Sequence, residues 1–254
     1  MGALMESADQ NNIVLELKNI NKSYNENRVH RGISFKVRKG ECLGLLGGSG
    51  TGKSVLLRSI IGLEYIDSGE ILFHKNRIDT LSEKELLKLR LTISYSFQSG
   101  ALFDSINVYE NLAYPLYEHT GHSDKEIADK IKNMLKLIGL EGKENIMPSD
   151  LSGGMQKRVG MARAMIMNPD LVLYDEPTAG LDPVNTLNVI DLMAKFKTDG
   201  RSAIFVTHDI PAAVKLCDRI AIIDEGKIFF EDTVDKFKNS NDPLVKKFMV
   251  NTGI

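Results

Sequence analysis

One stretch of eight residues has the spacing of a loop that binds phosphate. In order, these residues are Gly47, Gly48, Ser49, Gly50, Thr51, Gly52, Lys53 and Ser54, which fit G-x-x-x-x-G-K-[ST] between an apolar strand and a predicted helix. Glycines let the backbone wrap closely around a phosphate, and the following helix adds the positive end of its dipole. Lys53 can reach the β and γ phosphates, and the Ser54 hydroxyl can bind Mg²⁺.

Three more titratable residues follow predicted strands. Asp175 and Glu176 come directly after Leu171–Tyr174, and His208 follows Ala203–Thr207. Ligands of open α/β sheets gather at the carboxyl ends of strands. We therefore expect Asp175 to hold Mg²⁺ and Glu176 to orient or deprotonate an attacking water. A lone histidine there is usually structural, but beside a nucleotide His208 can contact the γ-phosphate or the water.

A second anion site is predicted at Ser152, Gly153 and Gly154. These residues precede Met155–Ala164, which is rich in strong helix formers, so Ser152 is a good N-cap. The free N–H groups at the start of such a helix bind anions. Because a phosphate loop already exists, one explanation is that the second site serves a different molecule of nucleotide.

Composition excludes several classes of protein. The chain has 254 residues, 43% of them hydrophobic and 26% charged, which is unlike collagen, disordered chains or disulfide scaffolds. With 32 Lys and Arg against 34 Asp and Glu, the net charge of −2 provides no general field for nucleic acid. Two cysteines, Cys42 and Cys217, favour a reduced, cytosolic setting. Neither a membrane-spanning stretch nor a signal peptide is expected.

The strands and helices predicted around these residues form an α/β pattern. Short strand-like runs occupy residues 13–46, and from residue 170 strands and helices alternate. The spacing predicts helices over Lys53–Ile61, Ser82–Arg90 and Ser123–Leu137, the last two with capping pairs. A hairpin turn is expected at Asp224–Lys227.

These patterns divide the chain into three parts. Residues 1–12 are interpreted as a flexible N-terminus, 13–239 as a single domain with a helical subdomain over about 98–165, and 240–254 as a C-terminal tail. The predicted fold is therefore an α/β core into which a helical piece is inserted.

Leu151–Gln156, which reads LSGGMQ, resembles the signature of ATP-binding cassette (ABC) ATPases. The phosphate loop and Leu171–Glu176 appear in that family's order. The other matches are Gln98 to the Q-loop, Gly180-Leu181-Asp182 to the D-loop, Thr207-His208-Asp209 to the switch histidine and Tyr24 to the aromatic that stacks on adenine. The resemblance covers about residues 13–235 and implies a P-loop NTPase core with a mostly parallel sheet and an antiparallel β part near the N-terminus.

The resemblance also implies a mechanism with ATP and Mg²⁺ as cofactors. Two copies pack head to tail, and each ATP lies between the phosphate loop of one copy and Ser152–Gly154 of the other. Gln98 senses the γ-phosphate and relays closure to a membrane subunit. The implied site residues are Glu176, His208 and Gln98 for catalysis; Ser54, Gln98 and Asp175 for the metal; and Tyr24, Gly47, Gly48, Ser49, Gly50, Thr51, Gly52, Lys53, Ser54, Val55, Ser152, Gly153 and Gly154 for ATP.

A narrower resemblance is to the ATPases of Mla/MCE-type phospholipid transporters. It is carried by Phe97–Ser105, Asn107–Leu116, Gly52–Leu57 and Gly153–Gly160. It implies a peripheral protein on the cytoplasmic face of the inner membrane that powers movement of lipid between that membrane and the outer envelope. The implied partners are a permease, an MCE-domain lipid-binding protein and a small STAS-domain subunit.

Three other functions remain open. The ATPase of an amino-acid or other solute importer has the same core sequences but usually differs at Gly100–Phe103. A soluble ABC protein acting on ribosomes or DNA usually carries two cassettes or long coiled-coil insertions, and this chain has one cassette and no net positive charge. A degenerate cassette that binds ATP without hydrolysing it is disfavoured because Glu176 and His208 are both present.

Overall fold

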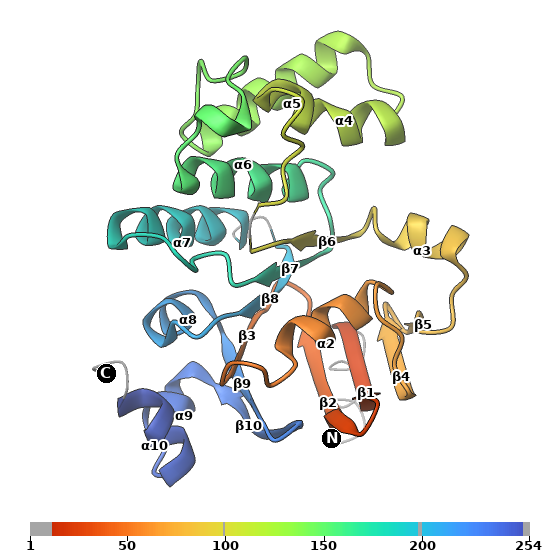
Figure 1. Cartoon of the computed structure of the whole chain (residues 1–254), viewed down its shortest axis with the longest axis vertical. Helices are drawn as coiled ribbons and strands as arrows, with labels where there is room; N and C mark the ends of the chain where they lie inside the picture. The colour runs from red at the N-terminus through yellow and green to blue at the C-terminus, as the bar shows by residue number, and fades with distance from the viewer. Residues whose placement is uncertain (1–11, 99, 198–199, 251–254) are drawn as a thin grey trace.

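A computed structural model describes residues 12–98, 100–197 and 200–250, which form two sheets with helices around them (Figure 1). The predicted flexible segment therefore lies outside the described residues except for residue 12, as do the last four residues of the predicted tail. The helices between residues 108 and 165 lie at the top of Figure 1, and the antiparallel sheet lies at the lower right.

The antiparallel sheet has four strands in the order β2-β1-β4-β5. Its strands are β1 (Ile13–Tyr24), β2 (Asn27–Arg38), β4 (Ser68–Phe73) and β5 (Asn76–Arg77). In β2, Ile33, Phe35 and Val37 are buried while the residues between them are exposed, as expected for a strand with one buried face. The first two strands are twelve residues each, longer than the short runs predicted.

The second sheet has six strands in the order β10-β9-β3-β8-β7-β6. It comprises β3 (Cys42–Gly47), β6 (Ile93–Ser96), β7 (Leu171–Asp175), β8 (Ser202–Val206), β9 (Arg219–Asp224) and β10 (Lys227–Thr233). The five strands from β9 to β6 are parallel, and β10 pairs antiparallel with β9 through the predicted hairpin. The α/β fold with a mostly parallel sheet is confirmed.

Helices cover both faces of the six-stranded sheet. They are α2 (Lys53–Ile60), α3 (Glu83–Leu89), α4 (Val108–His119), α5 (Asp124–Leu137), η1 (Pro148–Asp150), α6 (Gly153–Met165), α7 (Pro183–Lys197), α8 (Ile210–Leu216), α9 (Val234–Lys238) and α10 (Pro243–Val250). One core joins one face of this sheet to α4 through α8 and the C-terminal helices. The other core joins the opposite face to α2 and the antiparallel sheet. Alternate residues of β7 enter the two cores, as a strand buried on both faces requires.

The helix starts agree with the predicted caps. Ser82 and Ser123 are N-caps of α3 and α5, and each forms a capping box with the glutamate three residues later. On α5, Ile127, Ile131 and Leu135 are fully buried, so the helical stripe is a core face. Within the segment predicted to be mainly helical, the first helix begins at Val108, and the described residues among 98–107 contain no helix, so this region starts later than about 98.

The two cysteines lie beside each other in the first core. Cys42 begins β3 and Cys217 follows α8, and their Sγ atoms are 3.7 Å apart although 175 residues separate them. Both are free and buried. Burial raises the pKa of the Cys217 thiol well above its usual value, which disfavours the reactive thiolate.

The C-terminal helix packs on the first core. Val245 of α10 is fully buried, and the Phe248 ring lies 6.1 Å from that of Phe229 on β10. Among the described residues, no helix combines the length and apolar character that crossing a membrane requires.

Gly160 on α6 brings that helix unusually close to the chain after β6. A Cβ at this position would lie 2.6 Å from the Gly100 carbonyl oxygen and 2.7 Å from its Cα. Both contacts are backbone, so relieving them means moving a segment. We expect Gly160→Ala to cost toward the upper end of about 1–3 kcal/mol, more than the ~1 kcal/mol that alanine gains over glycine in a helix.

Urea unfolding of Gly160→Ala tests this close approach. The matched control is Gly121→Ala, because a Cβ at Gly121 meets nothing within 4 Å. A lower unfolding midpoint for Gly160→Ala alone is expected, and equal midpoints for both variants would contradict the observed packing.

Candidate functional site

The phosphate-binding loop connects β3 to α2 at the carboxyl end of the six-stranded sheet. Gly48, Ser49 and Gly50 are exposed, and Gly52 has φ of 90°, a conformation that side chains disfavour. The predicted residues Gly47, Thr51 and Val55 complete the loop and the first turn of α2.

Lys53 lies inside the curve of this loop. Its Nζ donates to the carbonyl oxygens of Gly47 at 2.9 Å and Gly48 at 2.8 Å, and the residue is only 6% exposed. Burial lowers the pKa of the Lys53 ammonium, while the nearby carboxylates of Glu176 and Asp175 act in the opposite direction. A cation held this way favours an anionic ligand in the loop.

Ser54 and Asp175 meet although 121 residues separate them. The Ser54 hydroxyl donates to Asp175 Oδ1 at 2.8 Å. Hydroxyl and carboxylate oxygens are ligands that Mg²⁺ prefers, so the donor set fits the predicted metal. Gln98, the third predicted ligand, follows β6 at the same edge of the sheet, but its side chain is exposed and makes no described contact with the other two.

Glu176 and His208 form a pair at the ends of neighbouring strands. Glu176 follows β7 with φ of 48°, and its N–H donates to the Val206 carbonyl of β8. The His208 Nδ1 lies 2.6 Å from Glu176 Oε2, and the imidazole is largely exposed. Glu176 thus combines a left-handed backbone conformation, of the kind that clusters at functional sites, with a carboxylate that contacts the histidine.

The second predicted anion site lies at the start of α6. Ser152 is the N-cap, its Oγ accepts from the Met155 N–H, and Ser152 and Gly153 are exposed. Gly154 packs against Asn185, whose amide donates to Asp182 at the start of α7. Helix α6 belongs to the core on one face of the sheet, and α2 belongs to the core on the other. The structure therefore does not bring the two anion sites together within one chain.

Tyr24 lies at the turn between β1 and β2. It is the last residue of β1. The Tyr24 side chain is exposed, and the Lys22 ammonium lies 4.8 Å from its ring centroid. No hydrogen bond joins it to the phosphate-binding loop within the described chain, so its role as an adenine contact stays a prediction.

Two residues near the site were missed by the sequence analysis. The Tyr95 hydroxyl donates to Asp175 Oδ2 at 2.5 Å, and burial and this carboxylate raise the pKa of the phenol. His30 of β2 is buried with its Nε2 3.0 Å from the Gly52 carbonyl oxygen, and burial lowers the pKa of the imidazole. The one sequence signal that could have identified Tyr95 and His30 is a side chain with a polar group, a phenol or an imidazole, within a strand-like run.

An apolar groove of about 310 Å³ lies between the end of β6 and helices α4 and α6. Phe97, Phe103 and Tyr114 line it and are each 42–50% exposed. The Arg163 guanidinium lies 5.0 Å from the Phe103 ring centroid and donates to the Ala101 carbonyl and to Asn111. The groove thus lies next to Gln98, and Arg163 of α6 holds the segment that forms one of its walls.

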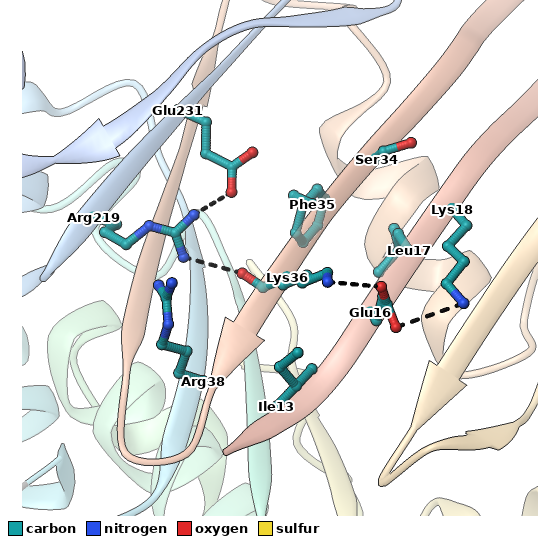
Figure 2. Close-up of a pocket in the computed structure, with 10 residues that line it drawn as sticks. All are labelled: Ile13, Glu16, Leu17, Lys18, Ser34, Phe35, Lys36, Arg38, Arg219 and Glu231. Carbon is teal, nitrogen blue, oxygen red and sulfur yellow. Dashed lines mark hydrogen bonds and ion pairs between the residues drawn. The ribbon is translucent and has the colours of Figure 1, made fainter. Parts of the chain in front are cut away.

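A larger hollow, of about 560 Å³, lies elsewhere, between β1, β2 and the start of β9 (Figure 2). The charged side chains that line this hollow form ion pairs with neighbouring side chains. Lys36 pairs with Glu16 at 3.1 Å, and Arg219 pairs with Glu231 and with Glu41. None of the predicted site residues lines it. This hollow is therefore not the nucleotide site.

Comparisons with known proteins agree with this geometry. The family model described as ABC transporter matches residues 30–179. The chain is 38% identical over 258 residues to Protein TRIGALACTOSYLDIACYLGLYCEROL 3, chloroplastic, of Arabidopsis thaliana, spanning 94% of this chain and 74% of the relative. It is 34% identical over 237 residues to the intermembrane phospholipid transport system ATP-binding protein MlaF of Escherichia coli, and the match spans 93% of this chain and 88% of the relative.

Similarity extends to an importer and to solved cassettes. The methionine import ATP-binding protein MetN of Carboxydothermus hydrogenoformans is 40% identical over 243 residues, spanning 94% of this chain and 72% of the relative. A dimeric post-hydrolysis structure of the ATP-binding cassette MJ0796, bound to ADP and Pi, superposes with a TM-score of 0.80. It has 31% identity and covers 87% of this chain and 98% of that one.

Replacing Lys53 by alanine tests the loop. Loss of a buried ammonium removes charge-assisted contacts with phosphate, each worth about 1.5–3 kcal/mol, so nucleotide affinity is expected to fall about 10- to 100-fold. A titration with a fluorescent ATP analogue measures this. Lys132→Ala, on the exposed side of α5, is the matched control. Unchanged affinity in the Lys53 variant would count against the assignment.

Proposed function

This chain belongs to the ABC transporter family and is an ATP-hydrolysing subunit, and we propose that its transporter moves phospholipids or related lipids between the inner membrane and the cell envelope. The observation that carries the proposal is its similarity to MlaF over 88% of that protein's length, whose name specifies intermembrane phospholipid transport. The Arabidopsis relative, named after a galactolipid, adds support.

A solute importer is the second candidate. The methionine import relative is 40% identical, slightly more than either relative with a lipid in its name. The two candidates share the ATPase chemistry and differ in the membrane partner. The segment Gly100–Phe103, which leads into the groove, is where we expect the difference to lie.

We infer that the nucleotide site is shared between two copies packed head to tail. The phosphate-binding loop and Ser152–Gly154 both suit an anion, yet they are attached to opposite faces of the sheet. A second copy supplies the missing half: ATP lies between the loop of one chain and the α6 start of the other. The dimeric cassette with ADP and Pi supports this arrangement.

The paired Glu176 and His208 carry the proposed catalysis. Glu176 is placed after β7, at the end of the loop-bearing sheet, where a carboxylate orients or deprotonates the attacking water. His208 holds Glu176 and reaches toward the γ-phosphate. Ser54 and Asp175 hold Mg²⁺, with Gln98 at the same edge; when bound, Mg²⁺ neutralises charge on the phosphates.

The groove beside Gln98 is the proposed docking site for a permease subunit. Its exposed aromatic residues suit an apolar segment, and its contact with α6 connects it to the Ser152–Gly154 site. A subunit docked in this way would lie peripherally on the membrane, and the cytoplasmic face of the inner membrane is the location we propose. An MCE-domain lipid-binding protein and a small STAS-domain subunit are the further proposed partners.

Glu176→Gln is expected to trap the ATP-bound dimer with little turnover. The amide keeps the size of the side chain but cannot accept the proton of the attacking water, so ATP hydrolysis should fall by about 10²-fold or more. Sedimentation in the presence of ATP measures the fraction of dimer, and a phosphate-release assay measures the rate of hydrolysis. Glu225→Gln, in the exposed β9–β10 turn, is the control. Hydrolysis at the wild-type rate would refute the assignment.

Phe103→Ser is expected to uncouple the ATPase from its permease while sparing nucleotide binding. Phe103 and Leu244 are each 46% exposed, so Leu244→Ser is a matched control away from the groove. Removing a ring at the centre of an interface typically costs about 2 kcal/mol or more. Co-purification and transporter-coupled ATPase rate measure the effect. Undiminished permease binding and coupled activity in Phe103→Ser would contradict the docking proposal.

The substrate is tested by affinity purification of the tagged protein from detergent-solubilised membranes, with co-purifying proteins and lipids identified by mass spectrometry. A permease with an MCE-domain protein and bound phospholipid supports lipid transport. A solute permease with a different binding protein would leave the ATPase chemistry intact and reject the lipid proposal.

A further inference from the structure

Tyr95 contacts two functional regions at once. It lies on β6, and its hydroxyl donates to Asp175 Oδ2 at 2.5 Å. Its ring lines the groove and packs on Phe97, with ring centroids 4.4 Å apart and tilted by 47°. One end of the side chain therefore lies at the metal-binding carboxylate and the other at the proposed docking surface.

The two oxygens of Asp175 have different partners. Oδ1 accepts from Ser54, the other predicted metal ligand, and Oδ2 accepts from Tyr95. Asp175 is 8% exposed, so water gives little help in orienting it. The phenol therefore fixes the rotation of the carboxylate and keeps Oδ1 directed at Ser54. Hydrogen-bond partners that orient a ligand in this way control metal affinity.

Phe97 connects this arrangement to the surface. It is the residue before Gln98, it is 42% exposed, and its ring braces that of Tyr95. A protein segment that fills the groove contacts Phe97 and the Tyr95 ring together. Because the Tyr95 ring and hydroxyl form one rigid group, a shift of the ring at the groove moves the hydroxyl at Asp175.

We propose that Tyr95 is a positioning residue that orients Asp175 for the divalent cation and links the metal site to occupancy of the groove. The second half of this proposal rests on the groove being the docking site proposed above. The first half depends only on the isolated subunit and holds for a lipid or a solute transporter alike.

Tyr95→Phe removes the hydroxyl and retains the ring. The measurement is the affinity of the isolated subunit for a fluorescent ATP analogue, titrated with Mg²⁺ and separately in EDTA. Loss of the orienting hydrogen bond is expected to raise the Mg²⁺ midpoint about tenfold while the affinity in EDTA stays unchanged. A structural defect would weaken both affinities, and a urea midpoint checks the fold.

Tyr117→Phe is the matched control. Its hydroxyl also contacts a carboxylate, Asp124 at 3.3 Å, but on the exposed α4–α5 surface. It should leave the Mg²⁺ midpoint at the wild-type value. An unchanged midpoint in Tyr95→Phe, or an equal change in both variants, would overturn the positioning role.

Phe97→Ala tests the link to the groove. This change removes the brace and leaves the Tyr95 hydroxyl in place, so a Mg²⁺ midpoint between those of the wild type and Tyr95→Phe is expected. A wild-type midpoint in Phe97→Ala would overturn the link. Both results come from the isolated subunit, whereas the lipid proposal is tested by the co-purifying permease and lipid, so the two can fail separately.

Discussion

The parallel pairing of β3, β8, β7 and β6 brings the predicted site residues to one edge of the sheet. These neighbouring strands all end at the same edge, so the phosphate-binding loop, His208, Asp175 with Glu176, and Gln98 follow one another across it. The Ser54–Asp175 hydrogen bond and the Glu176–His208 pair both join residues that this pairing made neighbours. Because the strands are buried on both faces, a shift in register would move core residues as well as the site.

The same sheet also keeps the two predicted anion sites of one chain apart. Helix α2 packs on one face and α6 on the other, so the two predicted anion sites of one chain lie apart. The proposed sharing of the nucleotide site between two copies accounts for this separation. On α6, Gly160 packs against Gly100 and Arg163 donates to the Ala101 carbonyl, so the helix that begins at the second predicted anion site also holds the chain after Gln98.

Local features were predictable from the sequence and distant pairings were not. The caps at Ser82 and Ser123, the strand before Asp175 and the hairpin near Asp224 depend on residues a few positions apart. The contacts of Tyr95 with Asp175 and of His30 with Gly52 depend on strand order and register, which no short pattern encodes. The roles of Ser54, Asp175 and Glu176 were predicted from the loop pattern and the strand ends, and those of Gln98 and Tyr24 were implied by the resemblance. The structure adds the Ser54–Asp175 and Glu176–His208 distances.

If each nucleotide site is built from two chains, mixing two variants with different defects should restore one site. Lys53→Ala removes the loop cation. Gly153→Asp, where a Cβ meets nothing within 4 Å, puts a carboxylate at the α6 start. Both carry Glu176→Gln, and the retained ATP is measured. If sites are shared, either variant alone spoils both sites of its dimer, whereas a mixed dimer has one intact site, so the mixture should retain more ATP than either variant. Retention equal to the average of the two variants would contradict a shared site.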